Sequence, residues 1–150
     1  MKHFAAIAIM LLCTFIATTG HSQTASKPKQ FSNFPDVIDC SEAALSSIFH
    51  STQGQNISLS FSDNFSFSGN VVNNVVKYDN LQSAVIKSAA YHNSIFSISR
   101  ITNKDNTVSY VGRIVNKNYF DGYELKRDAA GNYRLVKMET DRAIPDCSPN

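Results

Sequence analysis

The sequence contains few of the motifs that mark common active sites. It has no CxxC pair, no HExxH or HxH spacing, no Gly-x-Ser-x-Gly elbow and no glycine-rich phosphate loop. Their absence removes the usual sequence signals for a metal site, a serine hydrolase and a nucleotide-binding site. Internal repeats are absent as well, which favours a single domain.

Long hydrophobic runs are also missing, and the longest one lies near the start of the chain. Phe4–Ile16 follows a basic residue and is shorter than the roughly twenty residues that span a bilayer as a helix. The small residues Gly20 and Ser22 suit signal peptidase, so we predict a signal peptide over residues 1–22, with cleavage after Ala25 as an alternative. We therefore expect a secreted or periplasmic protein with no stable membrane insertion after cleavage.

Cysteine is scarce, with three residues in the chain. Cys13 lies in the predicted signal peptide, and lipid attachment there is disfavoured because Leu11 and Leu12 stand where small residues are expected. Cys40 and Cys147 remain, and we predict that they form a disulfide in an oxidising compartment. Such a bond closes a loop of roughly a hundred residues, which the chain-entropy model values at about 4–5 kcal/mol.

Positive charge is missing from one long segment. Residues 31–76 contain no Lys or Arg, whereas residues 77–142 contain eleven basic and seven acidic residues, and the whole chain has a net charge of +2. The second half either exposes more of its strands to water or carries a basic binding face. A near-neutral chain without a clustered basic patch argues against nucleic-acid binding.

The chain divides into three parts and begins its folded domain with a helix. We expect a flexible leader over residues 23–33, because this polar stretch lacks a hydrophobic period, and a single β-rich domain over residues 34–150. Asp39 is the predicted N-cap, with Glu42 completing a capping box. The helix should run to Phe49 or His50, with Cys40, Ala44 and Ile48 on its apolar stripe.

After the helix, the hydrophobic period changes to two and turn residues separate the apolar runs. Alternation of Phe or Leu with Ser predicts a hairpin whose inner face is aromatic. The predicted strands lie at residues 57–62, 65–68, 71–78, 81–88, 94–101, 108–115, 122–126 and 133–138. Their short links join antiparallel neighbours only, because a parallel crossover needs a dozen or more residues.

The predicted fold class is α+β. One short N-terminal helix precedes an antiparallel β-meander of about seven strands, which either stays an open curled sheet or closes into a barrel-like form. The apolar stripe of the helix has to be buried, so we expect the helix to cover the sheet.

Two histidines, His50 and His92, follow the signal peptide. His50 stands at the predicted helix end, where it can bind free carbonyls, and His92 stands in a predicted turn. A hydrolase that uses either histidine with a Ser and an Asp remains an alternative, although no motif supports it. We expect no cofactor and no metal site, because two histidines without ligand spacing make a poor zinc site.

Two surfaces are candidates for recognition. The serine residues opposite Leu59, Phe61 and Phe65, together with nearby asparagines, offer small neutral groups to a sugar or a partner's backbone, or else form an ordinary solvated face. The segment 118–123 crowds aromatics into a predicted loop of the basic half, as protein interfaces do. The candidate binding residues there are Tyr119, Phe120, Asp121, Tyr123 and Arg113.

These observations support three hypotheses of function. The first is an exported, non-enzymatic binding module, such as an inhibitor or an envelope or surface accessory protein, that recognises a protein or glycan outside the cytosol. The second is the small secreted hydrolase that uses His50 or His92. The third is a structural or pro-region domain. Fold class alone does not distinguish them.

Overall fold

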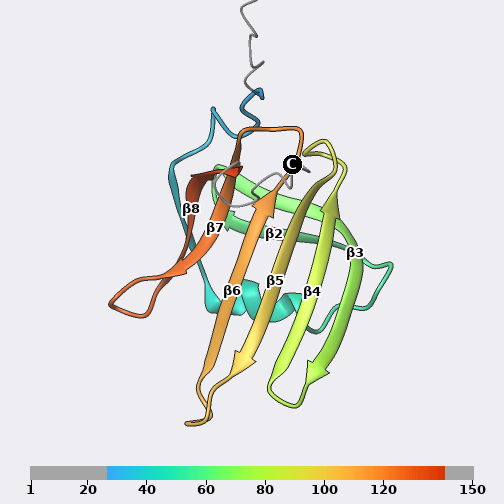
Figure 1. Ribbon diagram of the computed structural model, residues 1–150, viewed down its shortest axis with the longest axis vertical. Helices are drawn as coiled ribbons and strands as arrows, with labels where there is room; N and C mark the ends of the chain where they lie inside the picture. The colour runs from blue at the N-terminus through green and yellow to red at the C-terminus, as the bar shows by residue number, and fades with distance from the viewer. Residues whose placement is uncertain (1–26, 141–150) are drawn as a thin grey trace, which may run out of the picture.

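The computed structural model describes residues 27–140, which form one curled antiparallel sheet and a short helix (Figure 1). The predicted signal peptide, together with Cys13 and Cys147, lies outside this range. In chain order the elements are β1 (Val37–Cys40), α2 (Glu42–Ile48), β2 (Asn56–Ser62), β3 (Phe65–Tyr78), β4 (Leu81–Ser88), β5 (Ser94–Thr102), β6 (Val108–Val115), β7 (Asp121–Arg127) and β8 (Tyr133–Glu139).

The sheet is a meander with one strand added at its end. The strand order is β1-β8-β7-β6-β5-β4-β3-β2, and every neighbouring pair is antiparallel. β1 joins the far edge by pairing with β8, with Cys40 opposite Tyr133. β1 and β2 are the two edges, and the sheet curls until it is nearly closed and barrel-like.

The long strand β3 turns the corner between the two layers of this curled sheet. In Figure 1, β2 and the first half of β3 cross behind the steeply inclined strands β4, β5 and β6. β3 pairs with β2 up to Asn70 and with β4 from Asn70 onward. A Cβ at Gly69 would lie 2.5 Å from the Lys87 carbonyl oxygen, so the close approach at this corner requires glycine.

The helix α2 starts two residues later than the sequence predicts. Its N-cap is Ser41, whose hydroxyl oxygen accepts a hydrogen bond from the Ala44 N–H, and its C-cap is Phe49. The prediction of Asp39 as the cap was wrong, because Asp39 and Cys40 belong to β1. Cys40 still faces the core, since the alternation of β1 turns Ile38 and Cys40 inward.

Aromatic rings fill the space between the two layers. The predicted inward positions of the first hairpin are confirmed, because Leu59, Phe61, Phe65 and Phe67 are all buried. Phe67 stacks on Tyr91 at a centroid distance of 5.7 Å and meets Phe96 edge-on at 5.8 Å. Ring pairs at these distances add specific attraction to the burial of apolar area.

The segment Lys27–Asp36 is a strap that packs on one end of the sheet. Phe31 is fully buried, and its ring lies 5.2 Å from that of Tyr123 and 5.4 Å from that of Tyr91. The prediction of a flexible leader over residues 23–33 is corrected here for residues 27–33; residues 23–26 lie outside the described range. The leader interpretation missed Phe31 because a single aromatic residue produces no periodicity.

The α+β meander is confirmed, with two differences in detail. The predicted strands 65–68 and 71–78 are one strand, β3, because the chain bends at Gly69 without leaving the ladder. β1 was not predicted. The turns were placed correctly, and Gly131 adopts the positive φ that its turn requires, at 92°.

Residues 27–140 contain no helix that is long and apolar enough to cross a membrane.

Replacing the core ring of Phe67 by Ala should destabilise the fold by about 3–5 kcal/mol, because the change removes a buried ring and leaves a cavity. The matched control is Ser68→Ala, which alters the exposed neighbour and should change stability by less than about 0.5 kcal/mol. Chemical denaturation measures both. Equal effects at the two positions would contradict the inward orientation of Phe67.

Candidate functional site

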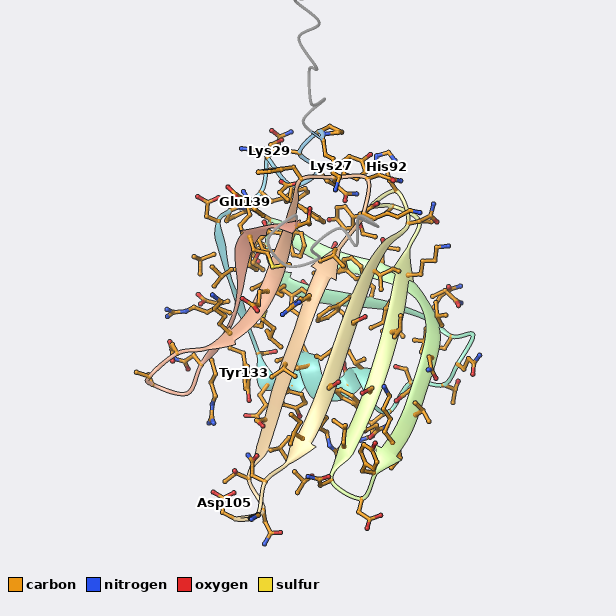
Figure 2. All side chains as sticks on the ribbon, viewed as in Figure 1. Lys27, Lys29, His92, Asp105, Tyr133 and Glu139 are labelled. Carbon is orange, nitrogen blue, oxygen red and sulfur yellow. The ribbon has the colours of Figure 1, made fainter. Side chains whose placement is uncertain are left out.

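The outer face of β6, β7 and β8, together with the strap, borders a groove of about 850 Å³, which we call the outer groove. Figure 2 shows Lys29 and Glu139 at this end of the molecule, far from Asp105. The groove contains side chains of both charge signs and an apolar floor. Its lining residues are Lys29, Ser32, Asp36, Val37, Arg113, Phe120, Asp121, Glu124, Val136, Lys137, Met138 and Glu139.

Strand register brings four of these side chains into one row. Arg113 of β6 lies opposite Glu124 of β7, Glu124 lies opposite Val136 of β8, and Val136 lies opposite Val37 of β1. All four point outward because each is next to a buried, inward-facing residue of its strand. The row thus runs from a charged pair to two apolar residues, and Val37 is 51% exposed.

The charged end of the row is held loosely. The Arg113 guanidinium lies 3.6 Å from the Glu124 carboxylate, which also lies 3.3 Å from the Lys126 ammonium group. The Arg113 side chain is 49% exposed. Exposed pairs of this kind contribute little stability, so Arg113 can exchange Glu124 for a partner's carboxylate at small cost.

Lys137 is held more firmly and joins the strap to β8. Its ammonium group lies 2.8 Å from the Asp36 carboxylate and donates a hydrogen bond to the Phe34 carbonyl oxygen, also at 2.8 Å. The hydrogen bond and charge of Lys137 lower the pKa of Asp36 below its ordinary value. The Lys137 side chain is 19% exposed, so it holds the strap against β8 and stabilises this wall of the groove.

Two of the predicted binding residues, Arg113 and Phe120, line the outer groove with partly accessible side chains. The sequence analysis missed Val136 and Met138, which form the floor. The only available signal was the period of two that places both on the face of β8 opposite the buried Leu135, a pattern that most outward-facing strand positions share.

Asp121 also borders the groove, but its side chain holds the strap. It is 3% exposed, and its carboxylate oxygens accept hydrogen bonds from the backbone N–H groups of Gln30, at 2.5 Å, and Phe31, at 2.9 Å. Phe120 N–H adds a third bond, to the Pro28 carbonyl oxygen. Asp121 therefore positions the groove wall and fixes Phe31 in the core.

The two predicted tyrosines lie away from the groove lining. Tyr123 is fully buried, so its prediction as a surface binding residue is corrected. Its hydroxyl donates to the Pro35 carbonyl oxygen at 2.6 Å, and burial, with the nearby charge of Asp121, raises its pKa. Tyr119 stacks on His92 at a centroid distance of 5.7 Å.

A second, smaller groove of about 400 Å³ lies between the end of α2 and β2. The predicted serine face is present beside it, because Ser58 pairs with Ser68 and Ser60 with Ser66, and all four are exposed. The lining residues of this edge groove are Ser47, His50, Ser51, Gln55, Asn56, Ile57, Ser58 and Leu59.

The geometry adds no support to the histidine-based hydrolase. His50 donates a ring hydrogen bond to the Ser46 carbonyl oxygen at 3.1 Å, the role predicted for a residue at a helix end. His92 lies in a turn with a φ of 49°, also as predicted. Within residues 27–140, neither imidazole is hydrogen-bonded to a carboxylate. The same range contains no cluster of three or more potential metal-ligating side chains.

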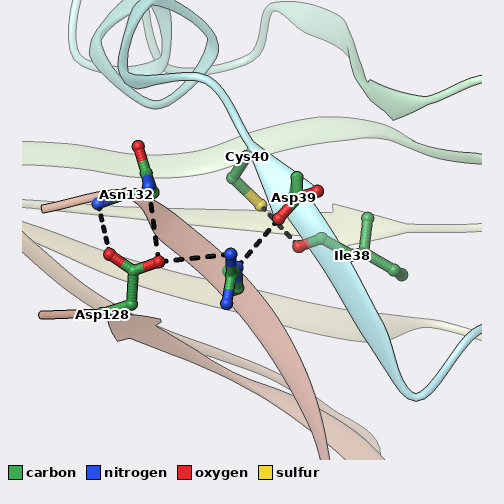
Figure 3. Close-up of polar contacts among 6 residues, drawn as sticks. Ile38, Asp39, Cys40, Asp128 and Asn132 are labelled. Carbon is green, nitrogen blue, oxygen red and sulfur yellow. Dashed lines mark hydrogen bonds and ion pairs between the residues drawn. The ribbon is translucent and has the colours of Figure 1, made fainter. Parts of the chain in front are cut away.

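Cys40 is a buried thiol, drawn in Figure 3 beside the charged pairs of Arg134 with Asp39 and Asp128. Its Sγ lies 3.6 Å from the Ile38 carbonyl oxygen, and burial raises its pKa to about 12. Its predicted disulfide partner, Cys147, lies outside the described residues, so the pairing stays a prediction.

The register of β1 limits how that disulfide can form. Cys40 lies opposite Tyr133, and Thr140, directly after the end of β8, follows seven positions later, a distance of about 23 Å at 3.3 Å per residue. Residues 141–147 span at most about 25 Å when fully extended. Seven residues are therefore just long enough to connect the end of the described chain with the position of Cys40.

We compared the chain with protein-family models, curated proteins and solved structures, and none of the three comparisons found a match. Function therefore has to be inferred from the side chains and their arrangement.

Replacing Asp121 by Ala should loosen the strap, because two backbone N–H groups lose a charged acceptor. We expect a loss of about 1–3 kcal/mol and faster hydrogen exchange at the amides of Gln30 and Phe31. The control is Asp128→Ala, which removes an acceptor from the exposed turn at Asn132 and should leave both amides protected. Unchanged exchange at these amides in Asp121→Ala would contradict the role of Asp121 in holding the strap.

Without its predicted partner, Cys40 should react slowly. In Cys147→Ser without residues 1–22, Cys40 is the one cysteine, and a pKa near 12 keeps its thiol protonated at pH 8. We expect a thiol reagent to label it only when denaturant is added, and rapid labelling of the native chain would contradict its burial.

In the unaltered processed chain, we expect Cys40 and Cys147 to be joined by the predicted disulfide. Non-reducing mass spectrometry that finds two free thiols would contradict this bond.

Proposed function

We propose that the protein is an exported, non-enzymatic binding module that holds a partner protein in the outer groove. The observation that carries this proposal is the row of Arg113, Glu124, Val136 and Val37 across four strands. It presents a cation, an anion and two apolar side chains within one concavity. A protein segment with an apolar side chain and a flanking carboxylate matches this arrangement.

The composition of the groove favours a protein over a glycan. Its floor is apolar, with Val136 and Met138, and its walls carry full charges of both signs. A protein partner gains by covering the apolar floor and by meeting charges of opposite sign. The hydroxyl groups of a neutral sugar can hydrogen-bond to these charged groups, but they carry no opposite charge and leave the apolar floor without an apolar partner.

The interior of the protein is filled by side chains, so the proposed binding site lies on the outer surface. In many barrel-like folds the ligand enters between the layers. Here, the rings of Phe31, Phe65, Phe67 and Tyr123 are each at most 1% exposed and pack against one another or against nearby rings. A ligand of ordinary size could enter only by displacing these rings, whose packing holds the two layers together.

The test is site-specific photo-crosslinking of the processed chain. A photoreactive amino acid at Met138, on the groove floor, should capture one defined protein from the fraction into which the chain is exported. The same amino acid at Lys104, in the turn at the opposite end of the molecule, serves as the matched control. Capture at both positions, or at neither, would contradict the outer groove as the binding site.

A charge reversal then tests the role of Arg113 on the captured partner. Arg113→Glu should weaken binding at least about tenfold, or about 1.4 kcal/mol, because it places a carboxylate beside Glu124 and repels the partner's anion. Lys104→Glu makes the same charge change far from the groove and should bind like the unaltered protein. Isothermal titration measures both, and equal affinities would overturn the proposal.

A further inference from the structure

The strand β2 has a free edge. It is the last strand of the sheet and forms a ladder with β3 alone; the curl of the sheet brings β1 close to it, but β1 forms a ladder with β8 alone. A strand edge offers a row of backbone donors and acceptors to any extended chain that can reach it. The edge groove lies at the first half of β2, so this half is open to solvent.

The backbone groups that face the free edge follow from the ladder. Val71 N–H donates to the Gln55 carbonyl oxygen at 2.8 Å. In an antiparallel ladder, residues bond to the neighbouring strand alternately, so Ile57 and Leu59 bond to β3 next. The N–H and C=O groups of Asn56, Ser58 and Ser60 therefore point away from β3, toward the edge groove.

This edge lacks two of the features with which proteins protect a free strand, namely charged side chains and proline. Residues 56–62 contain no Lys, Pro or acidic residue, although charges and proline on edge strands normally prevent pairing with other chains. The irregularity in the β2–β3 register lies between Ser60 and Ser62, beyond the part that borders the groove. The part of the edge that borders the groove, without charge, proline or a register irregularity, is suited to binding another strand.

The helix supplies the opposite wall of the edge groove. Ser47, His50 and Ser51, at the end of α2, face β2 across it. The side chains that line the groove are small, neutral polar or aliphatic groups, apart from the imidazole of His50. The groove therefore offers hydrogen bonds to a main chain and no full charge to attract a charged ligand.

We propose that the edge groove binds an extended, uncharged segment of a partner protein, which adds to the sheet as a strand beside β2. The unpaired backbone groups of β2 match those of a peptide and of no other common ligand class, and strand addition next to a helix is an established mode of peptide recognition. This site is separate from the outer groove and does not depend on the function proposed there.

The pleat of β2 sets the pattern that the peptide should have. Peptide residues opposite Ile57 and Leu59 would place their side chains on the inner face of the sheet, toward the helix, where apolar side chains are favoured. A peptide residue opposite Ser58 would place its side chain on the exposed face, which also carries Ser68 and where small polar side chains are favoured. The bound segment should therefore alternate apolar and small polar residues.

The probe is a displayed library of ten-residue peptides selected on the processed chain, with affinities measured by fluorescence anisotropy. We expect enriched peptides to show the alternating pattern and to bind Ser58→Pro at least tenfold more weakly, because proline removes an edge-facing N–H. Ser58→Ala keeps that N–H and should bind as the unaltered chain does. Enrichment of no peptide, or equal binding to Ser58→Pro, would overturn the proposal.

Two further measurements distinguish a loss of peptide binding from a loss of folding. Thermal unfolding should show that Ser58→Pro is folded, since its N–H takes no part in the β2–β3 ladder. Methylation of successive peptide amides should weaken binding at every second position, the signature of a strand bonded along one edge. Equal sensitivity at all positions would overturn strand addition, and self-association of the chain that Ser58→Pro abolishes would assign the edge to a second copy instead.

Discussion

The packing of aromatic rings between the two layers is the constraint on which the rest of this structure depends. Phe61, Phe65 and Phe67 project inward from the back layer and meet Phe96 and Tyr123 from the front. The corner at Gly69 lets one strand serve both layers, so the rings are enclosed by a single continuous sheet. Because these rings are mutually in contact, the space between the layers is occupied, and the proposed binding sites lie outside it.

The strap connects this core to the surface. Phe31 completes the ring cluster, and the carboxylate of Asp121 fixes the backbone on either side of the Gln30–Phe31 peptide bond. The same segment forms a wall of the outer groove, with Lys137 fastened to Asp36 and Phe34. The shape of the outer groove is therefore coupled to core packing, and a change at Asp121 acts on both.

The two proposed sites use different chemistry because they lie on different parts of the sheet. The outer groove lies across the middle of paired strands, where the backbone is already bonded and only side chains are available. The edge groove lies where the ladder stops, so the backbone of β2 is itself the binding group. Arg113 and Phe120 could be predicted from their side-chain types, whereas the free backbone of β2 is independent of side-chain type and gives no such signal.

Local pattern in the sequence determined the strands, the turns and the class of the fold, because a period of two in hydrophobicity reports which side chains are buried without reference to distant residues. Tertiary structure alone decided the pairing of β1 with β8, the burial of Phe31 and the alignment of Arg113 with Val136 and Val37. β1 is four residues long and alternates over too short a span to be recognised, and Phe31 is a single ring in a polar stretch. Each of these features joins segments about ninety residues or more apart in the chain, or sets the register between neighbouring strands, and neither kind of contact leaves a local trace.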